Sequence, residues 1–223
     1  MSISSTKSMP ALRAQALCEA FPRIYPDAHC ELNHSNPLEL LIATILSAQC
    51  SDVQVNKVTP NLFKKYRTAR DYAEADPDAL ERDLRAIGLY RNKAKNIRAA
   101  CRILADRHGG AVPRSMEELI QLPGVGRKTA NVVLGNAFGQ NVGIVVDTHV
   151  ARLSTRLGLT RQTDPAKIEI ALMKIVPREK WTLFSHWLIF HGRRRCKAQN
   201  PDCPGCELRH LCPSARILMK LKK

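Results

Sequence analysis

The 223-residue chain is long enough for one large domain or two small ones with a buried core. Hydrophobic residues make up 44% of it, and its longest apolar runs, 38–46 and 183–190, are much shorter than the roughly 20 residues that span a bilayer. We therefore expect neither a disordered chain nor a membrane-spanning one. Lys and Arg outnumber Asp and Glu by 35 to 20, and the formal charge of +15 favours a polyanionic partner such as nucleic acid.

The first half of the chain is a series of helices with clear starts and stops. Asn36 and Pro37 open a helix that runs to residue 49 and is apolar on most sides, so it is expected at the centre of a core. Asp52 can cap the next helix, which Pro60 should interrupt or kink. A further helix is expected from residue 77 to the glycine at 88.

The second half continues the helical pattern. A basic amphipathic helix covers 91–107, a capping box at Ser115–Glu118 starts a short helix, and another covers 127–138. Three more helices begin at Asp147, Asp164 and Lys180. Only 142–146 could form a strand, and it has nothing to pair with, so the prediction is all-α. We place a domain boundary near 139–143, with the N-terminal helix packing on the C-terminal half.

The eight cysteines divide into two groups. Four are scattered through helical or partly apolar segments, where a reduced cysteine acts as a small hydrophobic residue: Cys18, Cys30, Cys50 and Cys101. The other four are close together near the C-terminus, which suggests metal binding rather than disulfides. Because no secretory signal peptide is visible either, we expect a cytoplasmic protein.

The segment from Leu122 to Lys128 carries the first functional signal. A short helix leads into Gly124 and Gly126, and a second helix starts directly after them. The glycines permit a tight turn, and the N–H groups that open the second helix form an anion site suited to a DNA phosphate. This pattern is typical of a helix–hairpin–helix motif, although an ordinary turn between helices is the alternative. The motif predicts contact with the DNA backbone and no particular reaction.

Lys128 and Asp147 suggest a reaction. A neutral lysine amine can attack a sugar carbon and form a Schiff base, although a phosphate contact is the simpler role for Lys128. Asp147 follows an apolar run at a helix start, where an N-cap is the usual role. Placed opposite the lysine, its carboxylate could instead accept a proton and stabilise positive charge on the sugar. Sequence spacing leaves open whether the two residues meet.

The C-terminal cysteines are spaced Cys-x6-Cys-x2-Cys-x5-Cys, at Cys196, Cys203, Cys206 and Cys212. Structural zinc sites usually show two close cysteine pairs, and this segment has one. Four thiolates from a compact loop suit the corners of a [4Fe–4S] cluster, so the spacing favours iron–sulfur and leaves zinc open. Basic residues around the first cysteine predict a loop held against phosphate.

Together these segments resemble the endonuclease III family of helix–hairpin–helix DNA glycosylases. The matching stretches are LPGVGRKTANVVL at 122–134, VDTH at 146–149, HGRRRC at 191–196 with the cysteine tail, ELLIATILSAQCSD at 39–52 and IGLYRNKAKNI at 87–97. The resemblance covers roughly residues 11 to 213. Agreement of several motifs in this order and spacing makes it specific.

The resemblance implies a role for each matching residue. Lys128 matches the nucleophile, Asp147 the catalytic carboxylate, and the four C-terminal cysteines the ligands of a [4Fe–4S] cluster. Gln49 matches a residue inserted where the damaged nucleotide leaves the duplex, and Leu89 a wedge into the opposite strand, because the gap left by an extruded base must be filled. Further DNA contacts are implied at Gly124, Val125, Gly126, Arg127, His149, Arg193 and Lys197.

The implied architecture is two helical lobes flanking a DNA-binding cleft. Residues 31–140 are expected to form a six-helix barrel with the hairpin at about 115–138, and residues 1–30 with 141–223 an iron–sulfur cluster domain. Lys128 and Asp147 would face each other across the cleft.

The implied activity is base excision repair of oxidised pyrimidines, with action at abasic sites, in double-stranded DNA. Lys128 would form a Schiff base with the sugar, and β-elimination would cut the strand 3′ to the abasic site. We expect a bacterial monomer associated with the nucleoid.

Two other functions remain open at this stage. An adenine-mismatch glycosylase of the same superfamily would share the hairpin and cluster, but lacks a lysine at the position of Lys128 and usually carries an extra C-terminal domain. A non-catalytic DNA-binding module would use hairpin and cluster as a clamp. The joint presence of Lys128 and Asp147, and the end of the chain at Lys223, favour the bifunctional enzyme.

Overall fold

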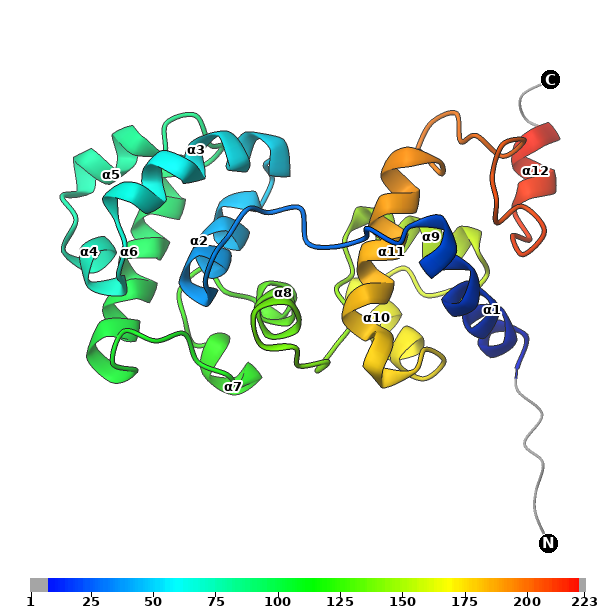
Figure 1. The fold of residues 1–223 in the computed structure, drawn as a ribbon, viewed down its shortest axis with the longest axis horizontal. Coiled ribbons are helices and arrows are strands. Elements are labelled where there is room, and N and C mark those ends of the chain that lie inside the picture. The colour runs from blue at the N-terminus through cyan, green and yellow to red at the C-terminus, as the bar shows by residue number, and fades with distance from the viewer. Residues whose placement is uncertain (1–7, 221–223) are drawn as a thin grey trace, which may run out of the picture. The chain divides into compact units, whose positions relative to one another are not determined.

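The computed structural model describes residues 8–220, and the chain forms two units (Figure 1). Unit 1 comprises Met1–His29 together with Gly143–Lys223, and unit 2 is the continuous segment Cys30–Val142. The sequence placed these boundaries after residues 30 and 140. Every regular element within 8–220 is helical, and 142–146 contains no strand, so the all-α prediction is confirmed.

Unit 2 is built around one apolar helix. Its helices are α2 (Pro37–Ser47), α3 (Asp52–Lys65), α4 (Ala69–Glu74), α5 (Pro77–Asp83), α6 (Tyr90–Arg107), α7 (Met116–Leu119) and α8 (Arg127–Phe138). All side chains from Leu40 to Leu46 of α2 are buried. Seven consecutive buried residues cover every face of a helix with 3.6 residues per turn, so α2 is enclosed on all sides, as its composition predicted.

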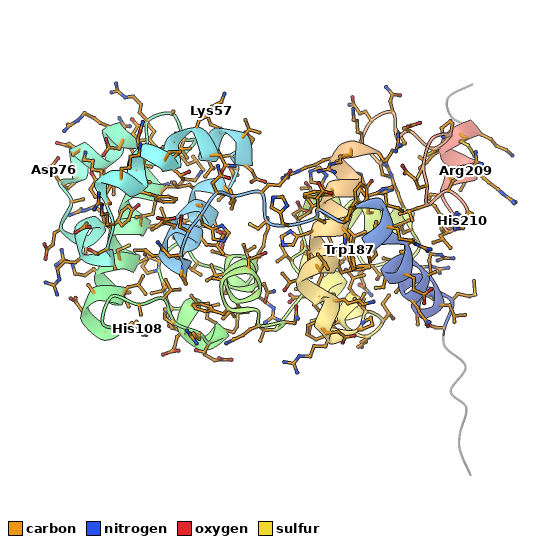
Figure 2. All side chains as sticks on the ribbon, viewed as in Figure 1. Lys57, Asp76, His108, Trp187, Arg209 and His210 are labelled. Atoms are coloured by element: carbon orange, nitrogen blue, oxygen red, sulfur yellow. The ribbon has the colours of Figure 1, made fainter. Side chains whose placement is uncertain are left out.

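Unit 1 joins the two ends of the chain. It contains α1 (Met9–Ile24), α9 (Thr148–Arg156), α10 (Pro165–Met173), a 3₁₀ turn (Arg178–Lys180), α11 (Trp181–Arg194) and α12 (Ala215–Lys220). Trp187 of α11 is labelled in Figure 2. Phe21 of α1 stacks on it with ring centroids 5.7 Å apart, and Phe21 meets Phe184 edge to face. The N-terminal helix therefore packs on a helix of the C-terminal half. Among the described residues, no helix is long and apolar enough to cross a membrane.

Several helix boundaries follow from side-chain caps named in the sequence. Asn36, Asp147 and Asp164 each accept a backbone N–H from three residues further on, which satisfies one of the unpaired donors at a helix start. These predicted starts are confirmed.

Three expectations about unit 2 were wrong. Ser51, one residue earlier than Asp52, caps α3. Pro60 lies inside α3 and does not interrupt it, because the neighbouring Thr59 and Leu62 are buried in the core and packing overrides the local cost of proline; a kink at Pro60 stays a prediction. The helix that starts at residue 77 ends at Asp83 and does not reach the glycine at 88.

Candidate functional site

The predicted hairpin is present as α7, a glycine turn and α8. Gly124 has a left-handed φ of 80°, and a Cβ there would lie 3.0 Å from Cβ of Asn96 on α6, so both conformation and space require glycine. Gly126 is the N-cap of α8 and provides no side-chain cap. The N–H groups at the start of α8, with its positive dipole end, therefore form an anion site.

Lys128 lies in the first turn of α8, beside this anion site. Its side chain is exposed, as is that of Arg127. Val125, which the resemblance named as a DNA contact, has its side chain buried in the core of unit 2 at 6% exposure. Val125 can therefore meet a ligand through its backbone, whereas Arg127 and Lys128 can do so through their side chains.

Gln49 and Leu89 occupy neighbouring loops of unit 2. Both are exposed and both adopt left-handed backbone angles, with φ of 54° and 58°. Such angles are uncommon for residues other than glycine and are concentrated at functional sites. A Cβ added at Gly88 would lie 3.6 Å from the carbonyl oxygen of Gln49, so the two loops approach each other closely.

Asp147 is the N-cap of α9 in unit 1. Its Oδ1 accepts a hydrogen bond from the backbone N–H of Val150 at 2.8 Å, and the residue is half-buried. The ordinary capping role is therefore present. It occupies one carboxylate oxygen, and it holds the side chain in a fixed orientation at the helix start.

Arg152 links the start of α9 to the cysteine loop. Its Nη2 donates to Nδ1 of His149 at 3.1 Å, to the carbonyl of Gly192 at 3.1 Å and to the carbonyl of Cys196 at 3.0 Å. A Cβ at Gly192 would lie only 2.8 Å from Nδ1 of His149 and 3.1 Å from Nη2 of Arg152. Glycine at 192 therefore lets α9 and α11 approach closely enough for this guanidinium to bridge them.

The four C-terminal cysteines line one pocket of unit 1. Nη1 of Arg156 lies 3.3 Å from Sγ of Cys196 and 2.7 Å from the carbonyl of Lys197, and its Nη2 donates to Ala198. Burial raises the pKa of Cys206 to about 11 and also raises that of Cys212, so a bound metal charge would be needed to hold these sulfurs as thiolates.

The arrangement of the cysteines bears on the metal. Within residues 8–220, no three His, Cys, Asp or Glu side chains come together as a single metal ion requires. Zinc needs its four ligands about 2.0–2.3 Å from one point. A cluster of several iron atoms spreads its four thiolates over separate corners. The four cysteines that line this pocket are the residues that could hold either kind of metal group.

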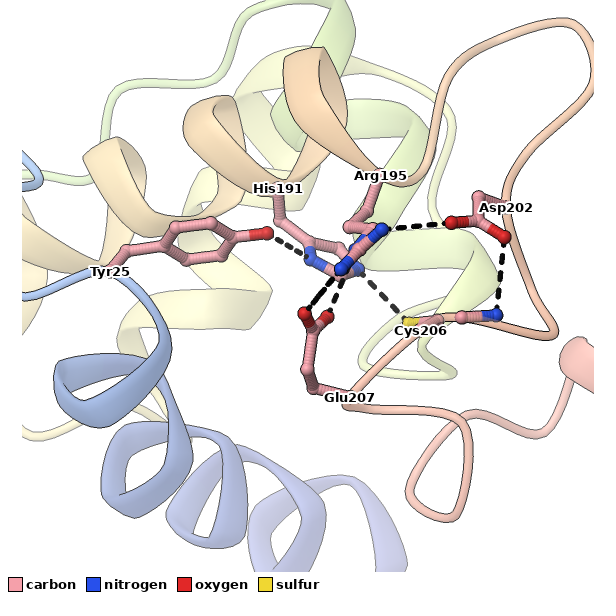
Figure 3. A network of polar contacts seen from close by, with 7 residues as sticks. Tyr25, His191, Arg195, Asp202, Cys206 and Glu207 are labelled. Carbon is pink, nitrogen blue, oxygen red and sulfur yellow. Dashed lines mark hydrogen bonds and ion pairs between the residues drawn. The ribbon is translucent and has the colours of Figure 1, made fainter.

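A hydrogen-bonded chain leads from α1 to the cysteine loop (Figure 3). The hydroxyl of Tyr25 lies 2.9 Å from Nδ1 of His191, and Nε2 of His191 lies 3.6 Å from Sγ of Cys206. Burial raises the pKa of Tyr25 to about 12 and lowers that of His191 to about 4, so a protonated hydroxyl meets a neutral imidazole. With Tyr25 donating to Nδ1, the imidazole proton is on Nε2 and points at the sulfur.

Part of the basic run before the first cysteine is used inside unit 1. Arg195 donates to Glu207 and to Asp202, with shortest distances of 2.7 and 2.9 Å, and so ties α11 to two points of the cysteine loop (Figure 3). The guanidinium of Arg194 lies over the ring of Phe190 at 4.2 Å. Arg193, Arg194 and Lys197 are the exposed members of this basic segment, and Arg194 and Arg195 are also engaged within unit 1, so the expectation that the whole run faces phosphate is too broad.

Sequence reasoning missed the residues that hold the site together. Arg152 and Arg156 lie four positions apart on α9, shortly after the VDTH motif. This spacing places both on one face of the helix and could have indicated a shared partner. His191 opens the HGRRRC motif but received no role. Tyr25 carried no signal, because its partner is 166 residues away.

Residues 42–178 match the HhH-GPD superfamily of base excision DNA repair proteins. The chain is 52% identical over 204 residues to endonuclease III of Synechocystis sp., an alignment that covers 92% of this chain and 93% of that relative. The chain belongs to the endonuclease III family. This chain is therefore a bifunctional enzyme, a DNA glycosylase that also has AP lyase activity.

Solved structures of endonuclease III with DNA have the same fold as this family member. A non-covalent endonuclease III–DNA complex matches with a TM-score of 0.88 and 53% identity, covering 96% of this chain and 100% of that one. A trapped endonuclease III–DNA covalent intermediate, the estranged-adenine complex, matches with a TM-score of 0.89 and 53% identity, covering 94% and 98%.

Gly192→Ala should destabilise unit 1, because the new methyl group overlaps the His149 side chain and pushes α9 away from α11. We expect a loss of about 1–3 kcal/mol in the free energy of unfolding, measured by denaturant titration. Gly88→Ala is the matched control, since its Cβ would make only an ordinary 3.6 Å contact. Equal stability of the two variants would show that the close approach at Gly192 is unimportant.

Proposed function

We propose that this endonuclease III homologue removes oxidised pyrimidines from duplex DNA and cuts the strand at the resulting abasic site. The observation that carries the proposal is the exposed Lys128 in the first turn of α8, directly after the glycine turn. A phosphate bound by the N–H groups of this helix start would bring the adjoining deoxyribose within reach of the amine. The similarity to a trapped covalent endonuclease III–DNA intermediate supports a covalent step.

In the proposed reaction, neutral Nζ of Lys128 attacks C1′ of the damaged nucleotide. The bond between C1′ and the base breaks, and the base leaves with the bonding electrons. Loss of a proton from nitrogen and opening of the sugar ring give a Schiff base between Lys128 and C1′. Removal of a C2′ proton then expels the 3′ phosphate by β-elimination, and water releases the enzyme.

Asp147 is proposed to serve the same sugar. Its carboxylate accepts the proton that the lysine nitrogen loses and stabilises positive charge developing on the sugar ring. The bond from Val150 fixes the orientation of this carboxylate before DNA binds, so little reorganisation is needed during the reaction.

The remaining roles concern binding of the duplex. Gln49 and Leu89 are proposed to fill the gap left by the extruded nucleotide, because both are exposed on neighbouring loops. The turn at 124–127 binds the backbone through N–H groups and the Arg127 side chain. His149, Arg193 and Lys197 of unit 1 are proposed as further DNA contacts.

We propose a [4Fe–4S] cluster held by Cys196, Cys203, Cys206 and Cys212. When bound, the cluster would supply a redox-active group, and its four bonds to cysteine would cross-link the loop between α11 and α12. The chain itself supplies hydrogen-bond donors toward the sulfurs, from Arg156 to Cys196 and from His191 to Cys206. Its basic loop, with Lys197, is thereby presented to DNA as a fixed surface.

Borohydride trapping tests the covalent step. Incubation with a thymine-glycol duplex in the presence of borohydride should leave wild-type protein covalently attached to DNA, because reduction fixes the Schiff base. Lys128→Gln should leave no adduct, and Arg127→Gln is the matched control that keeps the nucleophile. Absence of an adduct from the wild type, or full trapping by Lys128→Gln, would refute the proposed mechanism.

Asp147→Asn separates catalysis from capping at the same position. Asparagine can still accept the Val150 N–H, so α9 and the stability should be preserved. It cannot take up a proton, and we expect single-turnover excision to slow by about 10²-fold, with DNA affinity nearly unchanged. Parallel losses of rate and affinity would make Asp147 a structural cap only.

The metal content of the purified protein tests the proposed cluster. Protein purified without oxygen should contain about four irons per chain and absorb broadly near about 400 nm, as expected for a thiolate-ligated cluster. Cys203→Ser should lose both signals, while Cys101→Ser, a buried cysteine of unit 2, should retain them. One zinc per chain and no visible absorbance would overturn the assignment.

A further inference from the structure

Lys93 is a buried lysine to which the proposed reaction gives no role. It lies on α6 at 5% exposure, and its Nζ donates to the carbonyl of Leu46 at 2.9 Å and to that of Ala48 at 2.6 Å. Among residues 8–220 no carboxylate pairs with it. Burial lowers its pKa, as expected for an ammonium group removed from water. A charged group buried in this way is costly unless its partners compensate.

The partners of Lys93 are the unpaired carbonyls at the end of α2. A helix leaves its last carbonyls without intrahelical donors and carries partial negative charge at this end. Leu46 is in the last turn of α2, and Ala48 is its C-cap. Lys93 supplies the donors and the opposite charge directly before Gln49.

Lys93 is also bonded to the second loop. Its backbone N–H donates to the carbonyl of Leu89 at 3.1 Å, the first hydrogen bond of α6. One residue therefore holds the loop of Gln49 through its side chain and the loop of Leu89 through its backbone. We call residues 48–51 and 86–89 the wedge platform.

Two further contacts join the halves of the wedge platform. Nε2 of Gln54, in the first turn of α3, donates to the carbonyl of Ala86 at 3.2 Å. The backbone at Gly88 approaches the carbonyl of Gln49 closely. Gln49 and Leu89 at the two tips both hold left-handed angles that a non-glycine residue adopts only when its surroundings impose them.

We propose that Lys93 is a positioning residue that couples the Gln49 and Leu89 loops into one rigid wedge, so that both strands of the duplex are engaged together when a nucleotide is extruded. This inference rests on the proposed function, which assigns the gap-filling role to Gln49 and Leu89. Lys93 acts through these two residues and touches neither base nor sugar. A rigid wedge lowers the cost of ordering two separate loops at the moment of extrusion.

The test compares two substrates that differ in their need for the wedge. Excision of thymine glycol from a duplex requires extrusion, whereas cutting a preformed abasic site in a single-stranded oligonucleotide does not. Fluorescence of 2-aminopurine placed opposite the lesion reports unstacking directly. Duplex excision, single-strand cutting and 2-aminopurine fluorescence are all measured under single-turnover conditions with the full chain. Circular dichroism first shows that each variant is folded.

Lys93→Met is the key variant, because methionine has similar length and no donor. We expect duplex excision and the 2-aminopurine signal to fall about tenfold or more, and single-strand cutting to change less than about threefold. Arg102→Met is the matched control: Arg102 also lies on α6 and also donates to a carbonyl at the end of a helix, that of Ala73, but far along α6 from the wedge platform. It should leave the ratio of the two rates unchanged.

The outcomes separate the two proposals. Equal effects of Lys93→Met on both substrates, or the same ratio change in Arg102→Met, would overturn the role of Lys93. Failure of the wild-type protein to cut either substrate would reject the proposed function itself. If Lys93→Met does not fold, Gln54→Ala takes its place, since it removes only the contact to Ala86. A selective loss of duplex excision, about threefold, then supports the coupled wedge, and no selective loss refutes it.

Discussion

One guanidinium group, that of Arg152, holds together the parts of unit 1 on which the proposed chemistry depends. A single nitrogen bridges His149 beside Asp147, the carbonyl of Gly192 near the end of α11 and the carbonyl of Cys196. The guanidinium of arginine is planar and permanently charged, so it can donate hydrogen bonds to several acceptors that surround it. The start of α9, which carries the carboxylate proposed for the reaction, and the loop proposed to hold the cluster are thus joined by one side chain. Two hydrogen bonds of Arg152 therefore connect the cysteine loop to His149, two residues after Asp147.

The residues proposed to act on DNA share a second property: they lie at helix ends. Lys128 follows the start of α8, Asp147 caps α9, and Gln49 comes directly after the end of α2. Helix ends have unpaired backbone groups and partial charge, so they can hold an anion, a carboxylate or an ammonium group without further partners. The proposed site is therefore built from features that every helix possesses. What distinguishes this chain from an ordinary helical protein is the identity of the side chain at each of these helix ends.

The sequence predicted features that depend on neighbours along the chain. Caps such as Asn36 and Asp164, the glycine turn and the helical period are local, and they located α2, α8, α9 and α10. Short α4 was overlooked although its capping box, Thr68 with Asp71, is visible in the sequence. The pairing of Tyr25 with His191, of Arg152 with Cys196 and of Lys93 with Ala48 spans 166, 44 and 45 residues, and no periodicity records such contacts. The chemistry and spacing of Lys128, Asp147 and the cysteines suggested their roles but left alternatives open; the resemblance chose among these, and the roles remain predictions.

The split construction of unit 1 has a consequence for its synthesis. Helix α1 is made before the rest of unit 1, yet its Arg13 must wait for its partner Gly158, 145 residues later, which at about 5–20 residues per second is roughly 7–30 seconds. Unit 2 is continuous and can close its core in the meantime. The cysteine loop emerges after unit 2 and after helices α9 to α11. Binding of the proposed cluster therefore cannot precede synthesis of the cysteine loop, and a product truncated before this loop would carry the hairpin without the proposed ligands.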